Sequence, residues 1–117
     1  MTTRHHVVAI VPARDMDLSE AFYRRLGFVA ASDYGDYRIL EDGRGGHIHL
    51  NAMPGWPARI EDNALGLYFY VDDVDAVAER MRDLIIGAGP EQKPWGVYEF
   101  AVSDPNGALV RIGRVND

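Results

Sequence analysis

Apolar residues in the first half of this chain follow a strand pattern, then a helical one, then short strand patterns. His5–Ala13 is an almost continuous apolar run rich in Val and Ile, which predicts a buried strand. A helix is expected after it, with Asp17 as its N-cap and Gly27 as its C-terminal stop. Three further short strands are expected between glycine-rich turns, over 28–31, 37–40 and 47–51.

The second half repeats this order. Leu65–Val71 predicts a strand, and Asp72 or Asp73 is expected to cap a helix that Gly87–Pro90 ends. The apolar stripe of that helix comprises Val74, Val77, Met81, Leu84 and Ile85. Two strands are then expected, over 97–103 and 108–113, joined by the turn Asp104-Pro105-Asn106-Gly107, and residues 91–94 can hold a short extra strand.

The repeated order predicts an internal duplication, with equivalent strands about 58 residues apart. The stretch Met53-Pro54-Gly55-Trp56-Pro57 breaks every regular pattern. We place the two modules at residues 1–53 and 64–117, joined by a linker at 54–63. Each module has one helix to cover one face of a small sheet. The other face must be buried by the sister module or by a ligand. We therefore expect an α+β fold with eight or nine strands, in which mixed sheets curve around a shared cup.

Composition narrows the function classes. The chain has 117 residues, a net charge of −6 and no cysteine. An acidic surface disfavours nucleic acid and anionic lipid as partners, and the absence of cysteine excludes disulfides and thiolate chemistry. No apolar run approaches the roughly 20 residues of a membrane span, and the N-terminal residues lack the pattern of a signal peptide. We therefore expect a cytoplasmic protein.

Three motifs resemble those of the vicinal oxygen chelate superfamily, which includes glyoxalase I, extradiol dioxygenases, fosfomycin-modifying enzymes and bleomycin-binding resistance proteins. They are Phe22-Tyr23-Arg24-Arg25-Leu26-Gly27-Phe28, Val71-Asp72-Asp73 and Asp104-Pro105-Asn106-Gly107. The resemblance covers almost the whole chain and implies paired βαβββ modules. The stretch from Ala13-Arg14-Asp15 to Phe28, and Lys93–Ala101 with its Pro-Trp-Gly element, are most similar to the bleomycin resistance proteins.

The resemblance also implies where a metal would bind. Enzymes of this superfamily place ligands at four cup-facing positions, which correspond here to Val8, His49, Gly66 (or Leu67 with a one-residue slip) and Arg111. Valine and glycine side chains donate nothing to a divalent cation, and a guanidinium repels it. We therefore expect no metal cofactor and no catalytic residues, but an antibiotic-binding protein that sequesters its ligand in a homodimer.

Two alternatives stay open. A divalent metal could occupy a rearranged site made of His47, His49, His6 and Glu99, because His47 and His49 alternate on one strand and point the same way. The protein would then be a glyoxalase- or dioxygenase-like enzyme. Alternatively, the cup could be filled by the chain's own side chains, which would leave no cavity for a drug-sized ligand.

The candidate ligand-binding residues are mostly aromatic, because flat rings stack on planar compounds. Glu99 is expected at an acidic rim that attracts a cationic group, whereas Arg111 in the cup would need a partner or an anionic ligand. The ligand is thus expected to be a small molecule, cationic or planar aromatic. The full set comprises Trp95, Tyr68, Tyr70, His49, His47, Tyr37, Tyr34, Glu99 and Arg111.

Overall fold

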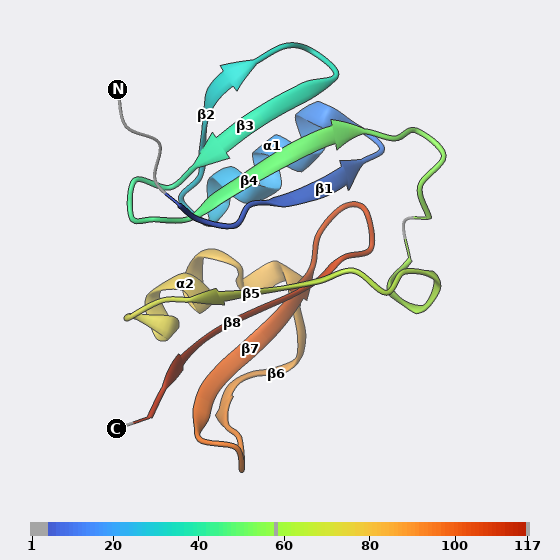
Figure 1. Ribbon diagram of the computed structural model, residues 1–117. Coiled ribbons are helices and arrows are strands. Elements are labelled where there is room, and N and C mark those ends of the chain that lie inside the picture. The colour runs from blue at the N-terminus through green and yellow to red at the C-terminus, as the bar shows by residue number, and fades with distance from the viewer. Residues whose placement is uncertain (1–4, 58, 117) are drawn as a thin grey trace. The chain divides into compact units, whose positions relative to one another are not determined.

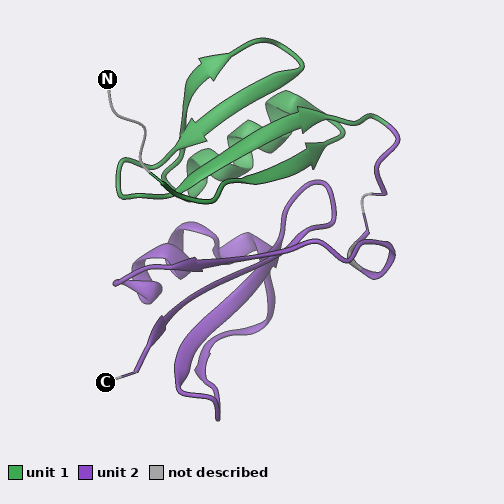
Figure 2. Cartoon of the chain, viewed as in Figure 1, with its two compact units in different colours: residues 1–54 green, residues 55–117 purple. Residues whose placement is uncertain are grey.

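The computed structural model describes residues 5–57 and 59–116, and the chain forms two compact units (Figure 2). The division between them falls between Pro54 and Gly55. No helix in the described residues is both long enough and apolar enough to cross a membrane.

The first unit is a four-stranded mixed sheet with one helix against one face (Figure 1). Its sheet order is β1-β4-β3-β2, with β1 and β4 parallel and the other pairs antiparallel. Val11, Leu40 and Leu50 are fully buried and form its core with aromatic side chains of the helix. Its elements are β1 (Ala9–Ala13), α1 (Met16–Arg25), β2 (Val29–Asp33), β3 (Tyr37–Glu41) and β4 (His47–Ala52).

The second unit has the same element order and the same sheet topology. Its sheet order is β5-β8-β7-β6, and β5 pairs with β8 in parallel. Val102, Val110 and Ile112 are fully buried, as is Met81 just after the helix. Its elements are β5 (Gly66–Tyr70), α2 (Val74–Arg80), β6 (Ile85–Gln92), β7 (Val97–Ser103) and β8 (Leu109–Val115), with 3₁₀ turns at Ile60–Asp62 and Arg82–Leu84.

The expected α+β fold with two βαβββ modules and mixed sheets is confirmed, with eight strands in the described residues. The Asp104–Gly107 turn is also confirmed. Asp104 is buried there, and its carboxylate accepts hydrogen bonds from the backbone N–H groups of Asn106 at 2.8 Å and Ala108 at 2.9 Å. The shared cup, the linker at 54–63 and the homodimer stay predictions.

The structure corrects the beginnings of the first strand and the first helix. The strand begins at Ala9 rather than at His5. Asp15, not Asp17, is the N-cap of α1, because its Oδ1 accepts a hydrogen bond from the Leu18 N–H at 3.0 Å. Asp17 lies in the first turn instead, where its charge favours the helix N-terminus and forms an ion pair with Arg38.

The second helix is shorter than predicted. It ends at Arg80, and Ile85 begins β6 rather than continuing an apolar helical stripe. Gly87 and Gly89 lie inside β6 with φ angles of 84° and 116°, which only glycine adopts readily. The pairing of β6 with β7 skips from Ile86 to Glu91 across this stretch. The glycines that we expected to end a helix therefore form a bulge in a strand.

Candidate functional site

One face of the second sheet gathers four of the predicted ligand-binding side chains. Tyr68 on β5 pairs with Arg111 on β8, and Gly113 on β8 pairs with both Tyr70 and Glu99. Since side chains alternate along a strand, these residues share one face, whereas Val110 and Ile112 point to the buried face. Gly66, rather than Leu67, also lies on the face that carries Arg111.

Glu99 is the centre of this group. It is only 2% exposed, and its carboxylate accepts hydrogen bonds from three side chains. Oε2 accepts from Nη1 of Arg111 at 3.1 Å, while Oε1 accepts from Nε1 of Trp95 at 3.3 Å and, more weakly, from the Tyr68 hydroxyl at 3.5 Å. A buried carboxylate requires such partners. Glu99 is therefore not at an acidic rim, as we predicted, but below the surface, where it orients three donors.

Tyr68 reaches Glu99 because the residue between them is glycine. A Cβ atom built on Gly113 would overlap the Tyr68 hydroxyl and approach Cβ of Glu99 at 2.8 Å. Burial raises the pKa of Tyr68, and the nearby negative charge of Glu99 raises that pKa further. Tyr68 therefore keeps its proton at neutral pH and acts as a hydrogen-bond donor.

Exposed aromatic rings lie beside this buried carboxylate. The Tyr70 ring contacts the Tyr68 ring, with their centroids 4.5 Å apart and their planes inclined by 34°. Tyr70 is 68% exposed and Trp95 is 65% exposed. We call Tyr68, Tyr70 and Trp95 the aromatic platform. Exposed rings that are held in place by neighbours suit the stacking of a planar molecule.

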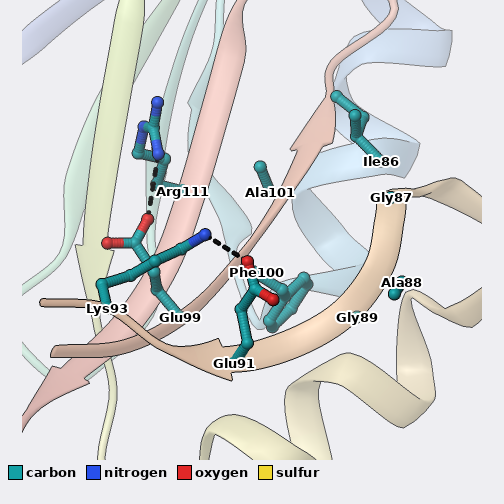
Figure 3. A pocket seen from close by; sticks show the side chains of 10 residues that line it. All are labelled: Ile86, Gly87, Ala88, Gly89, Glu91, Lys93, Glu99, Phe100, Ala101 and Arg111. Atoms are coloured by element: carbon teal, nitrogen blue, oxygen red, sulfur yellow. Dashed lines mark hydrogen bonds and ion pairs between the residues drawn. The ribbon is translucent and has the colours of Figure 1, made fainter.

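A small cavity of about 110 Å³ opens on the same unit (Figure 3). The bulge of β6 and residues of β7 and β8 line it, together with Lys93. Lys93 pairs with Glu91, and Arg111 pairs with Glu99, so each carboxylate in the lining already has a cationic partner. Ligand pockets usually measure about 300–1,000 Å³. This cavity can therefore admit a substituent of a ligand but not a drug-sized molecule.

The remaining predicted residues lie in the first unit. The Tyr37 hydroxyl and Nδ1 of His49 are 2.6 Å apart and share a hydrogen bond. His47 lies 3.8 Å from Glu41 on the neighbouring strand, and its ring centroid is 4.8 Å from that of His6. Tyr34 is 73% exposed in the turn between β2 and β3. The structure thus brings Tyr37 and His49 together, and His6 and His47 together, in a unit that does not contain Glu99.

The donors on the second sheet do not fit a divalent cation. At the two superfamily ligand positions on this sheet, Gly66 has no side chain and Arg111 carries a positive charge. Glu99, the nearest carboxylate, already accepts three hydrogen bonds. Among the residues that the structure describes, no three His, Asp or Glu side chains form a group that could hold a metal ion.

Sequence reasoning missed three features of this site. Gly113 showed no signal, because a strand glycine reveals its role only when the cross-strand neighbours are known. Lys93 lies within the stretch that holds the Pro-Trp-Gly element, but nothing in the sequence indicates that it lines a cavity. The bulge of β6 was mistaken for a helix end, although the two glycines that form it were visible in the sequence.

Comparison with known proteins agrees with the fold. The sequence model of the Glyoxalase/Bleomycin resistance protein/Dioxygenase superfamily matches residues 3–112. No curated protein matches the sequence significantly.

Solved structures give closer parallels. A bleomycin-binding protein in complex with bleomycin is 25% identical to this chain, with a TM-score of 0.79. The alignment covers 95% of this chain and 98% of that protein's chain. A bleomycin resistance determinant encoded on the transposon Tn5 is also 25% identical, with a TM-score of 0.80 and coverage of 97% and 99%. The bleomycin-binding protein of Streptomyces verticillus, complexed with copper(II)-bleomycin, shares the fold at 22% identity, with a TM-score of 0.72 and full coverage of both chains.

Proposed function

Because this chain belongs to the glyoxalase/bleomycin resistance protein/dioxygenase superfamily, we propose that it binds a planar small molecule, of the kind found among antibiotics, and acts by sequestering it. The observation that carries the proposal is the aromatic platform, in which a buried carboxylate orients the ring of Trp95 beside two tyrosines. Similarity to bleomycin-binding proteins at 25% identity supports antibiotic binding as the general class.

We further propose that binding needs no metal. A sequestering protein requires only affinity, so it can dispense with the metal ligands and acid–base groups of its enzymatic relatives. The support comes from the donor chemistry at Gly66 and Arg111, neither of which can bind a cation. Metal analysis of the untagged protein should find no stoichiometric zinc, nickel, iron or manganese. Metal bound at one ion per chain and lost in the His47→Ala or His49→Ala variant would favour the glyoxalase- or dioxygenase-like alternative.

We also propose that the protein acts as a homodimer. Each unit leaves large apolar side chains exposed, including Ile10 at 58% and Val115 at 61%. The cavity of the second unit is too small to enclose a drug-sized ligand. A second copy would supply the missing burial. Sedimentation equilibrium should give twice the monomer mass of 13.1 kDa, and a monomer at all concentrations would exclude this part of the proposal.

A thermal-shift screen tests the binding function. Bleomycin, mitomycin-type compounds and other planar natural products should be added to the native protein. A ligand at 100 times its dissociation constant contributes about 2.7 kcal/mol of stability, which is easily detected. A shift with a planar compound other than bleomycin would preserve the sequestration class and change only the ligand. No shift with any planar compound would argue against the proposal.

Replacing Trp95 identifies the surface that binds. Trp95→Ala should weaken binding of any compound found in the screen by about tenfold or more, because stacking on an aromatic side chain is lost. It should cost only about 1 kcal/mol of stability, because the ring is 65% exposed and Glu99 loses one hydrogen bond but keeps Arg111 and Tyr68 as partners. Tyr34→Ala is the matched control, since Tyr34 is similarly exposed, at 73%, but lies outside the platform. Equal affinity of the Trp95→Ala variant and the native protein would remove Trp95 from the binding surface.

A further inference from the structure

We propose that Arg111 binds a hydrogen-bond acceptor on the ligand, so that the site selects planar aromatic compounds bearing a carboxylate or carbonyl group over compounds bearing a cation. This inference rests on the proposed function and names the ligand class for the same site. It differs from the expectation of a cationic ligand that the acidic composition alone would support.

Glu99 has little left to offer a cationic ligand. Both of its carboxyl oxygens already accept hydrogen bonds, and the residue is only 2% exposed. A ligand cation could reach the carboxylate only by displacing Arg111, Trp95 or the Tyr68 hydroxyl. Displacing one of these donors would also disturb the aromatic platform. Glu99 is therefore a positioning residue, and its charge is already balanced within the protein.

Arg111, in contrast, retains donors for a ligand. A guanidinium carries five N–H groups, and Glu99 accepts from Nη1. The Arg111 side chain is 44% exposed, and it lines the cavity. An arginine held on one side by a buried carboxylate is preorganised to bind a second carboxylate or a carbonyl oxygen with its remaining N–H groups.

The cavity has the right size for such a group, and the charges of its lining balance, so it has no net negative charge to repel an acceptor. Lys93 is a second cation in its lining, and the two carboxylates there are each paired with one of the two cations. At about 110 Å³ the cavity can take a substituent, while the ring system stays outside it. Arg111, Trp95 and Tyr68 all contact the same carboxyl group of Glu99. An acceptor held by Arg111 therefore brings an attached ring next to the aromatic platform.

The local charge should outweigh the overall charge of −6. At physiological ionic strength the screening length is about 8 Å, so acidic groups farther away contribute little. A charge-assisted hydrogen bond from arginine to a carboxylate typically changes affinity by about 10- to 100-fold. The direct contact with Arg111 should therefore decide the preference.

Three acridine compounds that differ only at one substituent test the preference. Calorimetric titration of the native protein with acridine-9-carboxylate, acridine-9-carboxamide and 9-(aminomethyl)acridine compares an anion, a neutral acceptor and a cation on one ring system. We expect the carboxylate to bind at least about tenfold more tightly than the aminomethyl compound, and the affinity of the carboxamide to lie between those two. Arg111→Gln should remove this preference, and Arg111→Lys should retain part of it.

Arg114→Gln is the matched control. Arg114 lies on the same strand but on the other face, over the Tyr98 ring, and its loss should leave the preference unchanged. Equal or tighter binding of the aminomethyl compound would overturn this inference and leave the proposed function standing. A preference that persists in a folded Arg111→Gln variant would also overturn it. No binding by any of the three acridines would overturn this inference alone, because the thermal-shift screen decides the proposed function. The native protein gives this answer even where a variant fails to fold.

Discussion

Replacing Gly113 with alanine should destabilise the second unit, although the same substitution usually stabilises a strand. Gly113 does not have a positive φ, so an alanine there would reduce the entropy of the unfolded chain and contribute about 0.4–1 kcal/mol of stability. The added Cβ, however, would overlap the Tyr68 hydroxyl and lie 2.8 Å from Cβ of Glu99 and 2.9 Å from the Tyr98 carbonyl oxygen. Tyr68 can rotate away, but the last two atoms cannot move without shifting β7.

Overpacking of this kind typically costs about 1–3 kcal/mol, so the net loss should be about 1–2 kcal/mol. That corresponds to a melting temperature lower by roughly 4–8 °C, to be measured by urea and thermal unfolding. Gly66→Ala is the matched control, because Gly66 lies on the same face of the sheet. A Cβ atom added there would have the Leu109 carbonyl oxygen as its nearest neighbour, at an ordinary contact distance of 3.7 Å. That variant should be as stable as the native protein or slightly more so. A Gly113→Ala variant as stable as the control would refute the close packing of Tyr68, Gly113 and Glu99.

Three further predictions test other parts of the structure. Asp104→Ala should lower the unfolding free energy by about 2 kcal/mol, because two backbone N–H groups lose a buried acceptor. Asp42→Ala removes the same two-bond pattern in a more open turn, so it should cost less than about 1 kcal/mol in the same urea titration. Burial and the charge of Glu99 raise the pKa of Tyr68 in the folded state, so its contribution to stability is present below about pH 10 and lost as the pH rises through the folded pKa. The stability of Tyr68→Phe should therefore fall less steeply above about pH 10 than that of the native protein, and parallel curves would contradict the raised pKa. Asp15→Ala should cost about 1 kcal/mol as the loss of an N-cap and more than Asp17→Ala, and the reverse order would restore Asp17 as the cap.

Sequence patterns predicted the elements of this fold more reliably than their ends. The two βαβββ modules followed from repeated hydrophobic periodicity, which is set by how each strand or helix buries one face. The N-cap was misplaced by two residues, because Asp15 and Asp17 are both acceptable caps and only the backbone geometry decides between them. Similarly, Gly87 and Gly89 permit either a helix end or a bulge, and pairing with β7 decides.

The candidate site could be predicted only as a set of residues that share a face. Strand alternation puts Tyr68 and Tyr70 on one face, and the pairing of β5 with β8 shows that Arg111 lies on the same face. The role of Glu99 depends on distances across three strands, which no spacing along the chain reveals. The sequence suggested a carboxylate open to a cationic ligand, whereas its neighbours in space already occupy it.

The bulge of β6 also affects how this protein could aggregate. A regular strand at the end of a sheet offers an unpaired row of backbone groups to another polypeptide. In the described chain, β2 and β6 have irregular registers, and β1 contains Pro12, which lacks an N–H group. Of the four strands that end a sheet, β5 alone combines a regular register with a proline-free sequence. In the described residues, β5 is therefore the sheet edge with the fewest features that discourage pairing with another polypeptide.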